Sequence, residues 1–215
     1  IVGNKTVYTY RKSLGFELAK ENNISADVVV PIPDSGVSAA LGFSQKSSIP
    51  FELGIIRSHY VGRTFIEPSQ TIRQFGVKLK HSVNRSCIED KRVILIDDSI
   101  VRGTTASKIV KMVYEAGAKE VHLGISCPPI KHPDFYGIDT PNYNELIASK
   151  SNIEEMTELV GAKSLFFLSL DGTYKAMGYD ERNKVLPQFT DHCFTGEYPI
   201  DISEILKINS YNASR

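Results

Sequence analysis

Two adjacent carboxylates, Asp97 and Asp98, follow the apolar run of residues 92–96 and precede a glycine and two threonines at residues 103–105. Glycine lets the backbone approach a ligand closely, and threonine hydroxyls together with the amides at a helix start donate hydrogen bonds to an anion. The stretch therefore predicts a phosphate site. Because carboxylates repel a phosphate placed against them, Asp97 and Asp98 must bind a group a short way off, such as sugar hydroxyls or a magnesium ion that bridges to them. A ribose 5-phosphate meets both requirements.

The motif differs from the common phosphate-binding loops, because neither GxxxxGK[ST] nor GxGxxG occurs in residues 97–105. An alternative without a ligand is an acidic turn that only caps a helix. A second turn, residues 33–36 with the sequence PDSG, also follows an apolar run. It raises the same alternative, since Asp34 or Ser35 can serve as a helix N-cap.

The segments that must position these residues alternate between short apolar runs and stretches of helical periodicity. This alternation predicts an α/β fold with a mostly parallel sheet flanked by helices. The expected strands are residues 26–33, 51–56, 92–96, 119–126 and 164–170. The expected helices are residues 6–22, 34–48, 105–117 and 151–162, and we expect the last of these to be the final helix.

Ligands of such sheets bind at the carboxyl ends of strands, which directs attention to loops 33–36, 57–85 and 97–105. The middle loop has no clear periodicity, which in a compact domain is typical of a lid or a disordered stretch. It contains one acid, Glu67, and six basic residues: Arg57, Arg63, Arg73, Lys78, Lys80 and Arg85. A basic lid would neutralise an anionic leaving group and exclude water from a reactive sugar. The alternative is a solvated charged loop.

The composition excludes several classes of protein. The 25 basic and 25 acidic residues of the 215-residue chain balance, so no overall field would attract nucleic acid or a membrane. No apolar stretch has the length of a membrane span, and the first residues do not resemble a signal peptide, so we expect a cytoplasmic protein. The three cysteines are widely spaced, which favours free thiols. His122 lies in an apolar run and is expected to be a core residue rather than a ligand.

The sequence VILIDDSIVRGTT, residues 93–105, resembles the phosphoribosyl pyrophosphate (PRPP) signature of type I phosphoribosyltransferases. The sequences YVGRTFI, VPIPDSG, EAGAKEVHLGISCPPIKHPDFYGIDTP and FTGEYP are further similar to the amidophosphoribosyltransferase family, over nearly the whole chain. The resemblance implies a type I phosphoribosyltransferase domain over residues 1–215, with a flexible lid at about 57–85 and a C-terminal extension. It also implies that ammonia displaces pyrophosphate from PRPP to give 5-phosphoribosylamine, the first step of purine biosynthesis.

The resemblance assigns roles to residues in three loops. Asp97 and Asp98 would hold the ribose hydroxyls and, with Ser35, bind Mg²⁺. Arg63, Asp97 and Asp98 would be the catalytic residues, with no general base, because ammonia is already a nucleophile. The residues implied for the 5-phosphate are Ser99, Ile100, Val101, Arg102, Gly103, Thr104 and Thr105. Those implied for pyrophosphate are Pro33, Asp34, Ser35, Gly36, Arg57 and Arg63.

Members of this family carry an N-terminal glutaminase domain, which supplies ammonia from glutamine. Because this chain begins at Ile1 without it, we expect the phosphoribosyltransferase half alone, dependent on free ammonia. The family also implies a homo-oligomer and purine nucleotides as inhibitors. Some members bind an iron–sulfur cluster through cysteines. Here Asp134 and Thr190 replace two of those ligands and only Cys193 remains, so we expect no cluster, and we expect Cys87 and Cys127 to be packing residues.

Two other functions stay open from the sequence. A base-salvage phosphoribosyltransferase would share residues 97–105, but it offers no reason for YVGRTFI or FTGEYP. A regulatory protein that senses PRPP and binds nucleic acid would use the basic stretch 57–85. The zero net charge and the lack of a recognisable recognition helix argue against nucleic acid as a partner.

Overall fold

The computed structural model describes residues 5–58, 81–138, 140 and 142–203. Its central sheet contains four parallel strands in the order β1-β4-β5-β6. These strands are β1 (Val28–Pro31), β4 (Arg92–Asp97), β5 (Glu120–Ile125) and β6 (Ser164–Phe167). The expected α/β fold with a mostly parallel sheet flanked by helices is therefore confirmed.

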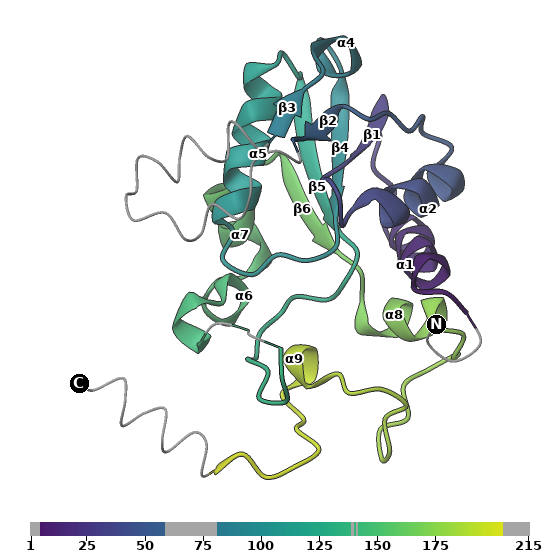
Figure 1. The fold of residues 1–215 in the computed structure, drawn as a ribbon, viewed down its shortest axis with the longest axis vertical. Coiled ribbons are helices and arrows are strands. Elements are labelled where there is room, and N and C mark those ends of the chain that lie inside the picture. Colours follow the sequence, from purple (N-terminus) through teal and green to yellow (C-terminus); the bar gives the residue numbers. More distant parts are fainter. Residues whose placement is uncertain (1–4, 59–80, 139, 141, 204–215) are drawn as a thin grey trace.

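Helices cover both faces of this sheet (Figure 1). Helices α5 (Thr104–Glu115) and α7 (Ile153–Val160) lie on one face, and α1 (Val7–Glu21) and α2 (Val37–Ser47) lie on the other. Strand β4 contributes to both cores, because successive side chains of a strand point to opposite faces. Val93 and Leu95 pack toward α5 and α7, whereas Ile94 and Ile96 pack toward α1 and α2. This two-sided burial explains why the strand reads as a continuous apolar run.

A separate two-stranded antiparallel sheet is formed by β2 (Ile55–Arg57) and β3 (His81–Val83), followed by α4 (Arg85–Ile88). Of the expected strand 51–56, only Ile55 and Ile56 are strand residues, and they belong to this second sheet. Within this stretch only Phe51 forms a bridge to Val29 of β1. The side chain of Ile55 is buried while that of Ile56 is 56% exposed. Such alternation suits a ribbon with one solvated face and not a strand that is covered on both sides.

The C-terminal part contains more helices than the sequence predicts. After the short helices η2 (Tyr143–Glu145) and α6 (Ile147–Lys150), helix α7 is followed by α8 (Leu170–Ala176) and α9 (His192–Thr195). The expected strand 164–170 ends at Phe167, because Ser169 caps α8 and its side chain accepts a hydrogen bond from the Gly172 amide. Helices of four to seven residues are too short to show a helical period, so the sequence did not reveal them.

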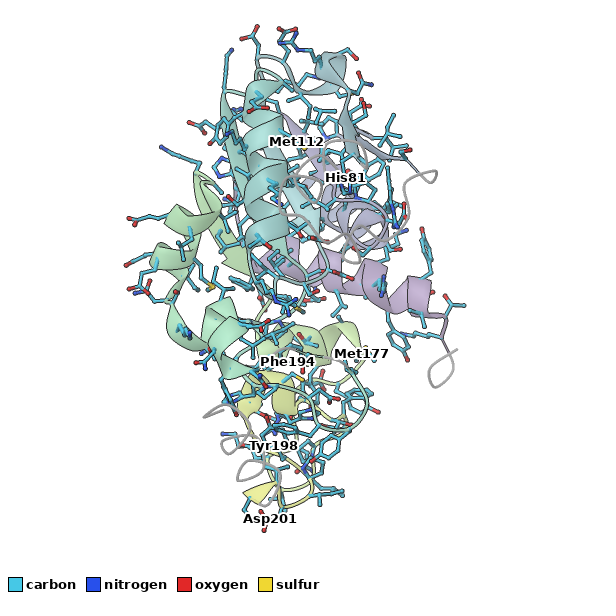
Figure 2. All side chains as sticks on the ribbon, turned by 60° about the vertical axis from the view of Figure 1, so that its left-hand side comes forward. His81, Met112, Met177, Phe194, Tyr198 and Asp201 are labelled. Carbon is cyan, nitrogen blue, oxygen red and sulfur yellow. The ribbon has the colours of Figure 1, made fainter. Side chains whose placement is uncertain are left out.

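Polar contacts organise this C-terminal part, and one of them attaches it to the segment after β5. The Tyr174 hydroxyl of α8 donates to Asp191, and Arg182 donates to the same carboxylate at 2.6 Å. The Tyr198 hydroxyl donates to the Pro133 carbonyl oxygen at 2.8 Å. Figure 2 shows Tyr198 at the opposite end of the molecule from Met112 of α5. Among the described residues, no helix is both long enough and apolar enough to cross a membrane.

Candidate active site

The acid pair lies at the carboxyl end of β4, where three strand ends meet. Asp97 is the last residue of β4, and its Oδ1 accepts a hydrogen bond from the Ser35 hydroxyl at 3.1 Å and from the Asp98 amide at 2.8 Å. Ser35 follows β1. Ser126 follows β5, and its amide and hydroxyl both donate to the Asp97 carbonyl oxygen, at 3.0 and 3.1 Å. The structure therefore joins the predicted turn 33–36 to the predicted acid pair.

Burial and the neighbouring carboxylate of Asp98 raise the pKa of Asp97 to about 7. The raised pKa means that the surroundings stabilise the ionised form of Asp97 poorly, and a bound cation would stabilise it. The oxygen donors of Ser35, Asp97 and Asp98 are of the kind that Mg²⁺ prefers, so these residues fit the metal that the family implies. The same surroundings act on Cys127, because burial and then the two acids raise the pKa of its thiol. Cys127 is therefore not a thiolate nucleophile.

The turn 33–36 lies between β1 and α2, and its Pro33–Asp34 peptide bond is cis. Arg57, at the end of β2, donates from Nη1 to Asp34 Oδ2 at 2.7 Å, so two of the residues predicted to bind pyrophosphate lie in contact. Helix α2 begins at Val37, later than predicted, and Gly36 is its N-cap without a side-chain capping bond. Neither the Asp34 side chain nor the Ser35 side chain therefore caps helix α2.

A side chain at Gly36 would not fit this turn. A Cβ there would overlap the carbonyl oxygen of Ile96 in the neighbouring strand. The glycine thus lets the turn lie directly against the end of β4, next to the acid pair. It is this close approach that brings the Ser35 hydroxyl within reach of Asp97.

The predicted phosphate loop connects β4 to α5. Gly103 adopts a left-handed φ of 76° immediately before Thr104, the first residue of the helix. The Ile100 side chain is buried in the core, so only its backbone remains for a ligand. Arg102 donates from Nε to Glu145 Oε2 at 2.6 Å, and its side chain is thereby directed toward residues 143–150. The Ser99 hydroxyl donates to Asp98 at 3.1 Å.

The predicted lid is only partly described. Arg57 belongs to β2, His81 to β3 and Arg85 to α4, so both ends of the predicted stretch are formed by regular elements. The remaining part, including Arg63 and the basic residues Arg73, Lys78 and Lys80, lies outside the described residues. The catalytic role of Arg63 stays a prediction.

Sequence reasoning missed residues that reach the loops from a distance. Arg11 of α1 lies with Nη2 4.0 Å from Asp98 Oδ2, Ser126 binds the Asp97 backbone, and Glu145 binds Arg102. None of them belongs to a local motif with its partner. Their only signal would have been correlated substitutions at distant positions in an alignment of related sequences.

Other side chains lie as expected. The three cysteines are free, and Cys87 and Cys127 pack against the core. His122 is buried in β5, with Nδ1 2.8 Å from the Ser164 hydroxyl, and burial above all lowers its pKa. It is a hydrogen-bonded core residue.

Two residues considered above for an iron–sulfur cluster, Asp134 and Cys193, lie together with His192. His192 Nε2 and Asp134 Oδ1 are 2.6 Å apart, and Asp134 Oδ2 accepts from the amides of Tyr136 and Ile138. Cys193 adds a sulfur, so that one ligand atom from each of Asp134, His192 and Cys193 lies within 4.8 Å of the others. Burial, and then Asp134, raise the pKa of Cys193 to about 11, so the group is a thiol. A cluster held by four thiolates does not fit this donor set.

Residues 12–137, more than half of the chain, match the family described as phosphoribosyl transferase domain. The chain belongs to the phosphoribosyltransferase family. Within this family it is 62% identical over 200 residues to an amidophosphoribosyltransferase of Rhizobium etli, covering 93% of this chain and 40% of that protein. It is 52% identical to the Bacillus subtilis amidophosphoribosyltransferase, covering 91% and 41%. It is 53% identical to a chloroplastic amidophosphoribosyltransferase of Arabidopsis thaliana, covering 95% and 35%.

A solved phosphoribosyltransferase-family structure has the same fold. The glutamine PRPP amidotransferase of Bacillus subtilis, complexed with ADP and GMP, superposes with a TM-score of 0.83 at 51% identity, covering 93% of this chain and 44% of that one. This chain spans about two fifths of the length of these relatives. The similarity therefore lies in the phosphoribosyltransferase part of the longer proteins.

Proposed function

We propose that this chain transfers the 5-phosphoribosyl group of PRPP to ammonia and releases pyrophosphate, as the phosphoribosyltransferase half of an amidophosphoribosyltransferase. The product is 5-phosphoribosylamine, at the first step of purine biosynthesis. One observation carries the proposal: the Ser35 hydroxyl binds Asp97, which joins the turn 33–36 to the acid pair and the loop 99–105. A single PRPP molecule requires sites for pyrophosphate, ribose and 5-phosphate side by side, and the contact between the turn 33–36 and the segment 97–105 supports such an arrangement.

Each group of PRPP has a matching partner. The carboxylates of Asp97 and Asp98 accept hydrogen bonds from the ribose 2- and 3-hydroxyls. The backbone amides of residues 99–105, at the start of α5, donate to the 5-phosphate. Arg57 and the turn 33–36 receive the pyrophosphate, and Arg63 of the lid completes this positive surface. Ser35, Asp97 and Asp98 would hold Mg²⁺, which would supply further positive charge to the leaving group.

Ammonia attacks C1 of the ribose on the face opposite the departing pyrophosphate. The transition state has the character of an oxocarbenium ion, as in glycoside hydrolysis, so stabilising the leaving group matters more than removing a proton. The chain accordingly contributes charge and orientation, and we assign no general base. Closure of the lid, which consists of residues 57–85, excludes water that would otherwise hydrolyse the reactive sugar.

The remaining features of the complete relatives belong to the same proposal. A glutaminase domain would supply the ammonia from glutamine, and the chain would act in the cytoplasm as part of a homo-oligomer. Purine nucleotides would inhibit the enzyme. This last point is supported by the related Bacillus subtilis structure, which contains ADP and GMP.

The test is pyrophosphate release from PRPP by the purified chain, with ammonium, with a panel of purine and pyrimidine bases, or with neither. We expect release only with ammonium and Mg²⁺. The double variant Asp97→Asn/Asp98→Asn should lose at least about 100-fold in turnover, because it removes both ribose-binding charges, while its circular dichroism stays unchanged. Release only with a base would indicate a salvage enzyme. Retention on nucleic acid that is sensitive to salt, without turnover, would indicate the regulatory alternative.

A further inference from the structure

The phosphate loop is attached to a segment that lies outside the central sheet. The Ile147 amide donates to the Val101 carbonyl oxygen at 2.9 Å. Next to it, Arg102 donates from Nε to Glu145 Oε2 at 2.6 Å, and its Nη2 contacts the same oxygen. At the following position, a Cβ on Gly103 would lie 2.8 Å from Ile147 Cδ1. Three successive residues of the loop, 101–103, therefore rest on residues 145–147.

This segment is itself held in one conformation. Leu146, between the two contacting residues, is fully buried. The Glu145 amide donates to the Asn142 carbonyl oxygen at 2.8 Å, and the Ser149 hydroxyl donates to the carbonyl oxygens of Tyr143 and Leu146. Residues 143–150 thus form a folded support, to which the Arg102 side chain is attached.

The charges around Arg102 make Glu145 necessary for this attachment. A cavity of about 510 Å³ lies between the loop and the support, and Lys108 and Lys150 line it together with Arg102. Among the described residues that line this cavity, Glu145 is the only acid. Without its carboxylate, the guanidinium of Arg102 would share the cavity with two lysines and with no acid among the described lining residues. The loop would then keep its backbone contact and the packing of Gly103, both to Ile147, but no charged contact to Glu145.

We propose that Glu145 is a positioning residue of the active site, which acts through Arg102 to hold the phosphate loop in the conformation that receives the 5-phosphate. This inference rests on the proposed function. Glu145 does not touch the substrate, and the Arg102 side chain anchors the loop from outside while the loop amides remain for the phosphate. Without the anchor, PRPP must order the loop when it binds. The free-energy cost of this ordering weakens PRPP binding and leaves the chemical step unchanged.

The pair is suited to a functional test because it contributes little to folding. The side chains of Arg102 and Glu145 are 53% and 49% exposed, and ion pairs of this kind add little to stability. We expect Glu145→Gln to raise KM for PRPP by roughly three- to tenfold at unchanged kcat and unchanged melting temperature. Glu145→Asp, which keeps the charge, should restore part of the affinity. The matched control is Glu115→Gln, which removes the exposed pair with Lys111 on the same helix that follows the loop.

Two further measurements distinguish a failure of this inference from a failure of the proposed function. In an Arg102→Ala background, Glu145→Gln should have no additional effect on KM, because the partner is already absent. Without any ligand, amide hydrogen exchange of residues 98–104 should be faster in Glu145→Gln than in Glu115→Gln. If the unmodified chain does not turn over PRPP with ammonium, the proposed function fails, while the exchange measurement still tests the anchor. An unchanged or lowered KM with unchanged exchange in an active enzyme would overturn the inference.

Discussion

The hydroxyl of Ser35 lies 3.1 Å from Oδ1 of Asp97, although 62 residues separate the two positions. The contact connects the loops that follow β1 and β4, which are neighbours in the sheet. Parallel strands present their carboxyl ends at one edge, so the sheet order decides which loops can share a ligand.

Removing this contact should weaken PRPP binding without unfolding the domain. We expect Ser35→Ala to raise KM for PRPP by about three- to tenfold, since a single hydrogen bond typically contributes roughly 0.5–1.5 kcal/mol. The Mg²⁺ concentration that gives half-maximal activity should also be higher for Ser35→Ala than for the unmodified chain. Ser47→Ala is the matched control, because the Ser47 hydroxyl donates to the Phe43 carbonyl oxygen within α2, away from the acids. Equal kinetics of the two variants would contradict a role for Ser35 in the site.

The raised pKa of Asp97 predicts a specific pH dependence of stability in the ligand-free domain. The pKa is about 7 in the folded chain against an ordinary value of 3.8, so the folded state binds more protons between these values. The favourable contribution is complete below pH 3.8 and is lost as the pH rises through 7. The free energy of unfolding should therefore decrease between pH 5 and 8, by about 2–3 kcal/mol.

The comparison that isolates this effect uses Asp97→Asn, whose amide does not titrate in this range. Denaturant unfolding of both proteins, with a chelator present, gives the difference in their free energies of unfolding at each pH. That difference should shift in favour of Asp97→Asn as the pH rises. A constant difference from pH 5 to 8 would show that Asp97 is already ionised throughout.

In the proposed function Arg57 receives pyrophosphate, and it contacts a carboxylate of the turn 33–36 at 2.7 Å. We expect Arg57→Ala to raise the inhibition constant of pyrophosphate by about tenfold, since hydrogen bonds to charged groups contribute roughly 1.5–3 kcal/mol. Its stability should change by less than about 1 kcal/mol, because the pair with Asp34 is partly exposed. Arg92→Ala removes a similar pair, with Asp27, from the start of the strand β4. Only a selective effect of Arg57→Ala on pyrophosphate inhibition supports the assignment.

The contact between Asp134 and His192 joins the loop after β5 to α9, and both side chains are almost completely buried. Asp134→Asn should lower the free energy of unfolding by roughly 1–3 kcal/mol, because the buried His192 loses its bond to the carboxylate. Burial raises the pKa of Asp134, but the amides of Ile138 and Tyr136 and the His192 bond outweigh this and lower it. Its contribution should therefore persist above pH 3.8 and decline only in more acidic solution. Thermal unfolding of both proteins at pH 7 and pH 3 measures this.

The sequence by itself determined the features that depend on neighbouring residues. The buried run before Asp97 identified β4, since a strand covered on both faces must be apolar throughout. The glycine and threonines after it indicated a turn into a helix start, and Gly103 indeed has the left-handed φ that favours glycine. Asp97, Asp98 and residues 99–105 could be proposed as a candidate site because they are contiguous in the chain, and their roles stay predictions.

Only the tertiary structure decided which distant groups complete the site. Ser126 and Glu145 contact the acid pair and the phosphate loop across 29 and 43 residues, and no local pattern marks them. The pairing of β2 with β3 likewise depends on which segments pack together, because an apolar run such as residues 51–56 suits either sheet. Local propensity specifies an element through its own hydrogen bonds and burial, whereas strand partners and long-range ion pairs follow from how the elements pack.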